Sequence, residues 1–303
     1  MPSKRPKPRS LSQPRLFELE SVGDDSRQGA TERPGEIPGI LLGTSSFTAK
    51  GWEGTFYPRG MRSPDFLGYY AKQFRTVEID STFYGTPKPS TVTKWKERTP
   101  PDFVFAVKVP QVVTHEKILT GCEQEFGEFA EAMGLLAEKL GPMLLQFPKF
   151  DKWMLKDSEA FLARLESFLK RVTNPALRFA VEIRNKNWLD ARLTDFLKER
   201  NVALALTDTT FLPKPWEMDL DLVTADFAYV RWLGNRKGIE ETTTTWDKAI
   251  IDREPDIRNW VDFLQQMVLN KNLRKIFAFA NNHYAGHAPN TVKLFEKLWR
   301  RVD

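Results

Sequence analysis

Residues 143–183, "MLLQFPKFDKWMLKDSEAFLARLESFLKRVTNPALRFAVEI", decide the fold class of this chain. The segment begins with the apolar run "MLLQF" (143–147) and continues through "SEAFLARLESFLKRV" (158–172), which has the apolar spacing of an amphipathic helix. It ends with a second apolar run, "RFAVEI" (178–183). Two short apolar runs separated by a helical segment are typical of a βαβ unit with parallel strands.

The same order recurs along the chain, which contains eight such apolar runs. Besides the two quoted above, they are "GILLGT" (39–44), "TVEID" (76–80), "FVFAVKV" (103–109), "VALALT" (202–207), "FAYVRWL" (227–233) and "IFAFA" (276–280). No GxGxxG or GxxxxGK[ST] loop follows any of them, which argues against a nucleotide-cofactor fold. Eight strands in about 265 residues fit a closed barrel better than an open sheet. We therefore predict an α/β protein with a single (β/α)8 TIM barrel over residues 37–303.

The N-terminal segment has a different composition. Its first fifteen residues, "MPSKRPKPRSLSQPR", contain five basic residues and no acid, and they lack hydrophobic periodicity. Such a segment buries too little apolar surface to offset its ordering entropy. We predict that residues 1–36 are a disordered tail rich in Pro, Arg, Lys and Ser.

Bulk properties favour a soluble cytoplasmic protein. The 303 residues carry a formal net charge of +5, and no apolar run approaches the length of about 18 residues that a membrane span needs. Cys122 is the only cysteine, which excludes an internal disulfide and fits a reducing compartment. The excess of positive charge is small and dispersed, so it gives only weak support to a nucleic-acid partner. We expect no membrane partner.

Polar residues interrupt the predicted strands near their C-terminal ends, where TIM-barrel enzymes build their active sites. Because side chains alternate along a strand, the apolar pair Val77 and Ile79 should face the helices and Glu78 should point into the barrel. The same rule places Arg231 on one face with Tyr229. Other inward candidates are Asp80, Lys108, Gln146, Glu182 and Arg184; in the last strand Ala278, Ala280 and Asn282 share a face.

Charges inside a barrel must be paired, because burying each ion costs several kcal/mol. One interpretation is therefore an internal salt-bridge network made by Glu78, Lys108, Glu182 and Arg231. We favour the other, a functional pocket, because stability alone would select aliphatic residues there.

The segment "NNHYAGHAPN" (281–290) holds two of the three histidines and follows the eighth strand. Asn281 and Asn282 offer amide groups, and His283 is a candidate general acid or base. For His287 we expect a loop-bracing hydrogen bond. A divalent metal held by these histidines with Glu182 and Asp208 is an alternative that we do not favour.

Aromatic residues cluster in the predicted loops after the strands. Two interpretations are open, namely stacking on sugar rings or nucleobases, and packing of the loops onto the barrel. These residues are Trp52, Tyr57, Phe83, Tyr84, Trp188, Trp232 and Tyr284.

Eight blocks, in order, resemble the YecE-like family, a domain of unknown function (number 72) with a TIM-barrel fold. They are "GTSSF" (43–47), "WEGTFYP" (52–58), "VEIDSTFY" (77–84), "FAVKVP" (105–110) with "TH" (114–115), "LLQFP" (144–148), "VEIRNKNWL" (181–189), "YVRWLG" (229–234) and "NNHYAGHA" (281–288). The resemblance covers about residues 38–300. It implies a barrel whose matched residues lie at the C-terminal mouth, and it implies no particular reaction.

Three positions depart from the family pattern as it stands in these blocks. Asp80 replaces a common Asn, and Asn185 and Leu233 replace histidines. The two missing histidines would have been proton-transfer groups, so attention shifts to Glu78, Glu182 and His283.

We predict a hydrolase or lyase acting on a polar, anionic substrate that carries a phosphate or carboxylate. Arg184 and Arg231 suit bidentate contact with such a group. We predict no particular cofactor and no metal-ligating residues. The candidate catalytic residues are Glu78, Lys108, Glu182, Asp208, Arg231 and His283. The candidate substrate-binding residues are Ser45, Asp80, Tyr84, His115, Gln146, Arg184, Trp188, Asn281, Asn282 and Tyr284.

Four other functions remain open from the sequence. One is a nucleic-acid-binding or endonuclease-like phosphodiesterase, and the second is a glycosidase-like enzyme that uses two carboxylates. The third is a non-enzymatic ligand-binding protein. The fourth is an aldolase that forms a Schiff base through Lys108.

Overall fold

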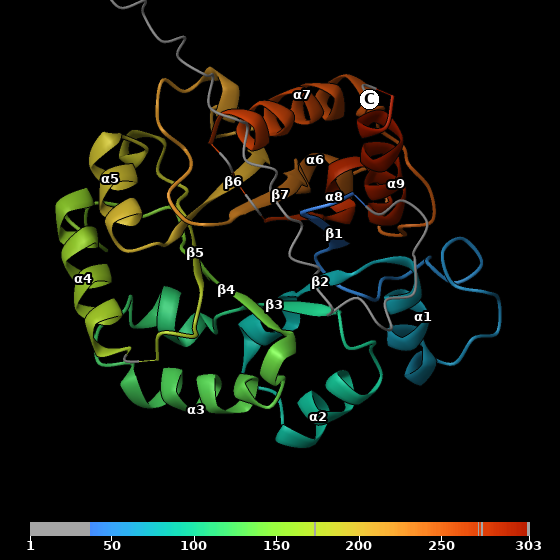
Figure 1. The fold of residues 1–303 in the computed structure, drawn as a ribbon, viewed down its shortest axis with the longest axis horizontal. Coiled ribbons are helices and arrows are strands. Elements are labelled where there is room, and N and C mark those ends of the chain that lie inside the picture. The colour runs from blue at the N-terminus through green and yellow to red at the C-terminus, as the bar shows by residue number, and fades with distance from the viewer. Residues whose placement is uncertain (1–36, 173, 272, 274, 302–303) are drawn as a thin grey trace, which may run out of the picture. The chain divides into compact units, whose positions relative to one another are not determined.

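The computed structural model describes residues 37–301 except residues 173, 272 and 274, so the predicted tail (1–36) lies outside the described residues. Eight parallel strands form one sheet in the order β1-β8-β7-β6-β5-β4-β3-β2, curled into a barrel inside a layer of helices (Figure 1). The predicted TIM barrel is confirmed. The strands are β1 (Ile40–Thr44), β2 (Thr76–Ile79), β3 (Val104–Lys108), β4 (Leu140–Gln146), β5 (Phe179–Glu182), β6 (Ala203–Thr209), β7 (Ala228–Gly234) and β8 (Ile276–Ala280).

The helices follow the strands in alternation, with one exception. They are α1 (Phe66–Gln73), α2 (Pro89–Glu97), α3 (Glu123–Gly134), α4 (Ser158–Arg171), α5 (Ala191–Glu199), α6 (Arg236–Glu240), α7 (Glu254–Lys271), α8 (Asn282–Ala285) and α9 (Ala288–Trp299). The exception is the β6–β7 connection, whose one helical element is the 3-10 turn Pro215–Glu217. Side-chain caps explain where α4 and α5 begin, because Asp157 accepts from Ala160 N at 2.9 Å and Asp190 accepts from Leu193 N at 3.1 Å. No helix in the described part of the chain is long and apolar enough to cross a membrane.

The seam between β1 and β2 is closed by a side chain. The hydroxyl of Tyr70, on α1, accepts a hydrogen bond from Thr44 N at 2.9 Å and lies 3.1 Å from the carbonyl oxygen of Thr76. It therefore bridges backbone groups of the first and second strands. Close approach at this seam also requires Gly43, since a Cβ there would lie 2.1 Å from Thr76 O.

Two apolar layers pack against the strands, one inside the barrel and one outside it. The inner layer fills the barrel and consists of Leu41, Ala106, Leu144, Ala180, Ala203, Ala205, Phe227, Tyr229, Phe277 and Phe279. The outer layer joins strands to helices and includes Val77 and Ile79, as strand alternation predicts.

The facing of β8 differs from the prediction. Ala278 and Ala280 belong to the outer layer, whereas Phe277 and Phe279 fill the barrel. The interior has room for these rings, and Phe279 packs against Tyr229 with ring centroids 5.2 Å apart. The inward placement of Asn282 is therefore wrong, because it rested on small residues facing inward.

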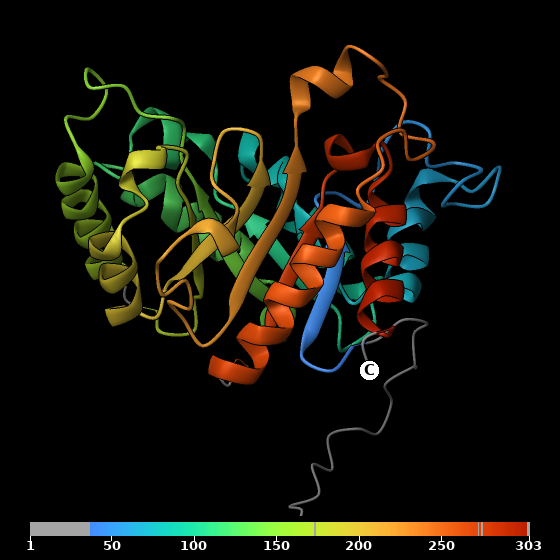
Figure 2. The ribbon, with the colours of Figure 1, turned by 90° about the horizontal axis from the view of Figure 1, so that it is seen from above.

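The strands all point toward one end of the barrel, which is the C-terminal mouth (Figure 2). The β4–α4 loop and the segment that contains α6 rise above this end (Figure 2). Polar residues of six strands, β2 to β7, and of several loops converge below them.

Candidate active site at the mouth of the barrel

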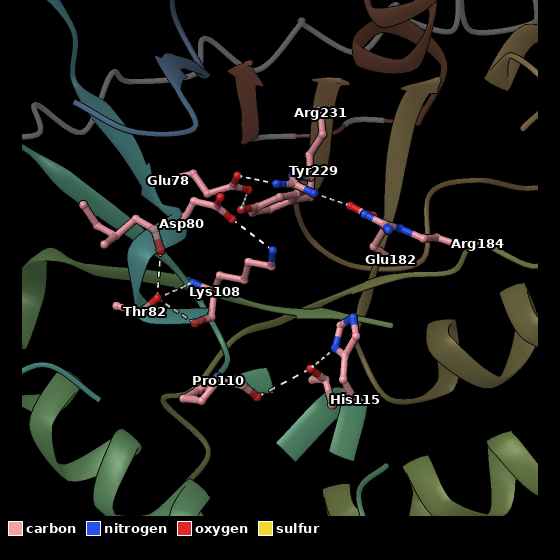
Figure 3. Close-up of polar contacts among 12 residues, drawn as sticks. Glu78, Asp80, Thr82, Lys108, Pro110, His115, Glu182, Arg184, Tyr229 and Arg231 are labelled. Atoms are coloured by element: carbon pink, nitrogen blue, oxygen red, sulfur yellow. Dashed lines mark hydrogen bonds and ion pairs between the residues drawn. The ribbon is translucent and has the colours of Figure 1, made fainter. Parts of the chain in front are cut away.

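A buried ion cluster lies beneath the mouth, centred on Arg231 of β7 (Figure 3). Its Nη2 lies 2.6 Å from Glu78 Oε1 on β2, and its Nη1 lies 2.5 Å from Glu182 Oε2 on β5. Tyr229 donates its hydroxyl to Glu78 Oε2 at 2.7 Å. Arg184 donates from Nε to Glu182 Oε1 at 3.3 Å. The cluster contains three of the four residues of the salt-bridge network considered from the sequence, whereas the fourth, Lys108, pairs with Asp80.

Electrostatics keep Glu182 and Arg231 ionised. Burial opposes ionisation of Glu182, but the guanidinium groups of Arg231 and Arg184 outweigh it and hold the pKa of Glu182 below its usual value. The pKa of Arg231 is raised well above its usual value, because the carboxylates of Glu78 and Glu182 outweigh burial. Glu182 is therefore a bound counter-ion at neutral pH and a poor general base.

Lys108, at the end of β3, is paired with Asp80. Its Nζ lies 3.0 Å from Asp80 Oδ1 and 3.8 Å from the centroid of the Phe83 ring. The backbone of Lys108 is held by Thr82, whose Oγ1 accepts from Lys108 N at 3.1 Å and donates to Lys108 O at 2.6 Å. Burial lowers the pKa of the lysine, and the carboxylate of Asp80 opposes that effect.

His115 lies beside this pair, in a short π-helix (Val112–Glu116) after β3. Its Nδ1 is 2.9 Å from Thr114 Oγ1, and its ring meets Phe83 edge to face at 4.9 Å. Burial and the charges of Lys108 and Arg184 lower the pKa of His115 to about 4. The imidazole is therefore neutral at pH 7 and can accept a proton or a hydrogen bond.

A cavity of about 350 Å³ opens above these groups. Residues of β3, β4, β6 and β7 line it, together with the segments after β2, β5, β6, β7 and β8. The lining residues are Asp80, Lys108, Gln146, Arg184, Thr209, Thr210, Phe211, Arg231, Leu233, Gly234, Asn235, Arg236, Lys237, Asn281 and His283.

The charge of this lining is predominantly positive. Lys108, Arg184, Arg231, Arg236 and Lys237 contribute cations, and among the described lining residues Asp80 is the one carboxylate. The ions below and beside the cavity compensate much of this charge, since Glu78, Glu182 and Glu240 pair with arginines of the lining. The positive charge that remains favours an anionic ligand.

The 281–287 segment divides into a pocket part and a structural part. His283 lines the cavity and is held by Asn281 Oδ1 at 2.5 Å and by Glu240 Oε1 at 2.9 Å. Asn282 instead accepts from Trp52 Nε1 at 3.1 Å. His287 caps α9 by accepting from Asn290 N at 3.1 Å, so its predicted bracing role is confirmed.

Several residues that the sequence suggested for the site lie apart from the cavity. Asp208 faces the outer layer, where it accepts from Trp260 Nε1 at 2.7 Å and Tyr284 OH at 2.9 Å and pairs with Lys214. The physical reason is strand alternation, because Thr207 and Thr209 take the inner face of β6. Tyr284 is buried with Asp208 and does not reach the cavity either.

Three further candidates stand outside the lining for different reasons. Trp188 is buried and stacks on Phe150 with ring centroids 5.4 Å apart. Ser45 is buried at the end of β1, where its backbone N donates to Ala280 O at 2.9 Å. Tyr84 is 73% exposed on the rim. For Trp188, as for the buried Trp52 and Trp232, the structure supports packing of loops and strands.

Other site residues were missed by sequence reasoning. Strand alternation could have indicated Thr209, which shares the inner face of β6, and Tyr229, which was placed inward without a role. Arg236 and Lys237 come from α6, and no strand pattern signals them. Glu240, the partner of His283, is 43 positions away in the sequence and carried no signal.

Metal ligation has no obvious set of ligands here. Within the described residues, no group of three or more His, Cys, Asp or Glu side chains is placed to hold a metal ion. Glu78 and Glu182 are both engaged by Arg231.

Fold and site together define a TIM-barrel protein with an ion-lined pocket at the C-terminal mouth. The chain belongs to the family described as "Protein of unknown function DUF72", whose model matches residues 41–302. It is similar to UPF0759 protein YecE of Escherichia coli (strain K12), with 39% identity over 82 residues, which are 27% of this chain and 30% of that protein. It is also similar to UPF0759 protein YunF of Bacillus subtilis (strain 168), with 30% identity over 147 residues, 46% of this chain and 50% of that protein. The matched stretches thus span half or less of these relatives.

Solved structures of the same family share the fold. A DUF72 family protein from Thermotoga maritima MSB8 superposes with a TM-score of 0.69 at 25% identity, covering 86% of this chain and 99% of that one. A DUF72 family protein from Enterococcus faecalis V583 gives a TM-score of 0.66 at 22% identity, covering 86% and 95%.

Proposed function

We propose that this protein is an enzyme, a hydrolase or lyase, that binds a small substrate bearing a phosphate or carboxylate at the mouth of the barrel. One observation carries the proposal. Lys108 on β3, Arg184 just after β5 and Arg231 on β7 are far apart in sequence, yet all three line one cavity of about 350 Å³. This volume lies near the lower end of the usual range for small-molecule sites, so the bound part of the substrate is small.

Arg184 is the residue best suited to hold the anionic group. Its Nε is engaged by Glu182, but its side chain is 35% exposed and lines the cavity. No described residue pairs with its terminal nitrogens, which leaves them available for a bidentate contact. Gln146, 2% exposed and also in the lining, has no hydrogen-bond partner for its amide within the described chain. It would orient the polar part of the substrate.

Acid–base chemistry falls to Asp80 and Lys108 rather than to Glu182. Asp80 has a partly exposed carboxylate in the lining and accepts a hydrogen bond from Lys108 Nζ at 3.0 Å. Glu78 and Glu182 hold Arg231, which positions the cationic floor of the pocket. His115 adds a neutral imidazole near the same pair.

Among the alternative functions, the glycosidase-like hypothesis is least supported. That mechanism needs one protonated carboxyl group and one free carboxylate flanking the substrate. Glu78 and Glu182 both form buried ion pairs with the same guanidinium. A nucleic-acid ligand would have to present a terminal phosphate to the cavity, and a purely binding role would need no Asp80–Lys108 pair.

Calorimetric titration of the full chain with inorganic phosphate and with small mono- and dicarboxylates tests the proposal. We expect binding that Arg184→Gln weakens at least about tenfold, since charge-assisted bidentate bonds are the strong ones. Arg192→Gln is the matched control, because Arg192 lies on α5, pairs with Asp190 and is 69% exposed. Equal affinities for the protein and both variants, or no binding of any anion, would contradict the proposal.

A further inference from the structure

Two lysines of this barrel are buried to a similar degree but in different environments. Lys108 is 7% exposed and Lys139 is 5% exposed. The Nζ of Lys139 donates to Lys96 O at 2.6 Å, Thr99 O at 2.7 Å and Thr99 Oγ1 at 3.1 Å. Three acceptors satisfy all three N–H groups of an ammonium ion. Lys139 therefore ties α2 to the turn before β4 and has no capacity left for chemistry.

Lys108 is incompletely satisfied and faces a cavity. Within the described residues its Nζ has one oxygen partner, Asp80 Oδ1 at 3.0 Å, and its other close contact is the Phe83 ring. The amine lines the 350 Å³ cavity. A buried amine that has few hydrogen-bond partners, an adjacent carboxylate and an open cavity has the arrangement of a nucleophile rather than of a structural ion.

We propose that Lys108 forms an imine with the carbonyl carbon of a small carbonyl acid or phosphate, such as a 2-oxo acid or an aldehyde phosphate. The inference rests on the proposed function, because the anionic end of the substrate would be held by Arg184. It deepens that function by naming the substrate class and by selecting the lyase reaction over hydrolysis.

The step balances with the residues present. Lys108 first transfers one proton to Asp80, which leaves a neutral amine and a protonated carboxyl group. The amine adds to the carbonyl carbon to give a carbinolamine, and the proton of Asp80 then leaves with the hydroxyl group as water. The product is a protonated imine beside the restored Asp80 carboxylate.

Surrounding charges favour this sequence. Burial lowers the pKa of Lys108, Asp80 opposes this, and the positive charge of Arg231 adds to the lowering. A larger fraction of neutral amine is therefore available than in an exposed lysine. The protonated imine withdraws electrons from the neighbouring carbon, so a C–H bond there can break, with its proton passing to the Asp80 carboxylate and its electron pair stored on nitrogen. A C–C bond can break in the same way when the departing carbon bears a hydroxyl group, which gives its proton to Asp80 as the fragment leaves as a carbonyl compound.

Reductive trapping tests the proposal on the full chain. The protein is incubated with pyruvate or glyoxylate and sodium cyanoborohydride, and modified lysines are located by peptide mass mapping. We expect one dominant adduct, on Lys108, with the Lys139 peptide unmodified in the same sample. Lys108→Met should abolish it. Asp80→Asn should slow trapping at Lys108 by about 10²-fold, the usual size of an acid–base contribution.

A neutral carbonyl compound separates this inference from the function on which it rests. With acetaldehyde as the probe, Lys108 should still be trapped, and Arg184→Gln should reduce trapping by pyruvate while leaving acetaldehyde unaffected. If Lys108 of the unsubstituted protein is labelled no faster than its exposed lysines, the imine proposal is overturned, even if the protein binds anions. Trapping of Lys108 with no preference for pyruvate would keep the imine and refute the anionic substrate.

Discussion

Arg231 on β7 reaches across the interior of the barrel to Glu78 on β2, with Nη2 and Oε1 2.6 Å apart. The same guanidinium binds Glu182 on β5, so a single side chain links three strands that are not neighbours in the sheet. All three groups are almost fully buried. Their charges must stay paired, and this requirement makes the cluster sensitive to any neutral substitution.

Glu182→Gln should destabilise the protein strongly. The substitution removes the carboxylate that faces both Arg231 and Arg184, and breaking a buried pair on one side costs about 3–5 kcal/mol. Urea unfolding followed by circular dichroism measures the change. Glu199→Gln is the control, because its side chain is 72% exposed and a surface pair contributes at most about 1 kcal/mol. A loss below about 1 kcal/mol for Glu182→Gln would show that the cluster is not an obligatory ion network.

Tyr70→Phe should weaken the β1–β2 seam. The hydroxyl accepts from Thr44 N, and its removal leaves a buried N–H group unsatisfied at a cost of about 1–3 kcal/mol. Amide hydrogen exchange should become faster at Thr44, with a smaller change in the β4–β5 ladder. Tyr69→Phe, one position earlier in α1, removes a hydroxyl that does not bridge these strands. Unchanged exchange at Thr44 would mean that another group closes the seam.

Gly43→Ala and Gly127→Ala should have opposite effects. At Gly43 a Cβ would lie 2.1 Å from Thr76 O, a backbone atom that cannot move without opening the barrel. The loss should reach or exceed the range of about 1–3 kcal/mol that overpacking costs. At Gly127, an exposed position of α3, nothing lies within 4 Å of the added Cβ, and stability should rise by up to about 1 kcal/mol. Thermal unfolding of both variants checks the pair, and a neutral Gly43→Ala would contradict the seam geometry.

His287 should make the protein less stable in mild acid. Burial, with a smaller contribution from Lys293, lowers its pKa from 6.5 to about 4. Between these pH values the unfolded chain binds a proton that the folded protein does not, so stability falls as the pH falls and levels off below about pH 4. The slope can reach about 1.4 kcal/mol per pH unit.

His287→Asn isolates this effect, because asparagine can still cap α9. Its unfolding free energy should depend less on pH between about 4 and 6.5 than that of the unsubstituted protein. Part of the dependence should remain, since the pKa of His115 is also lowered to about 4. Identical pH profiles for the two proteins would mean that His287 titrates normally in the folded state.

Local pattern predicted the site wherever a strand alternates between an inner and an outer face. Lys108, Gln146 and Arg231 could be placed inward because a residue two positions away is apolar and fills the barrel. Glu78 could be placed inward because its neighbours Val77 and Ile79 face the helices. The rule failed at β8, where large Phe residues face inward and small Ala residues face the helices. Along β6 the rule places Asp208 outward, on the face of Leu204 and Leu206, so the choice of Asp208 as a candidate catalytic residue went against alternation.

The sequence by itself determined the alternation of strands and helices, the barrel and the mouth at which the polar residues gather, because periodicity and strand-end position are local properties of the chain. Only the tertiary structure decided which charges pair. Arg231 meets Glu78 across 153 positions, Lys108 meets Asp80 rather than Glu78, and His283 meets Glu240. Those choices depend on barrel register and on the length of each side chain, which fix the distances between groups that are remote in sequence. They separate a buried counter-ion such as Glu182 from a lysine that still faces an open cavity.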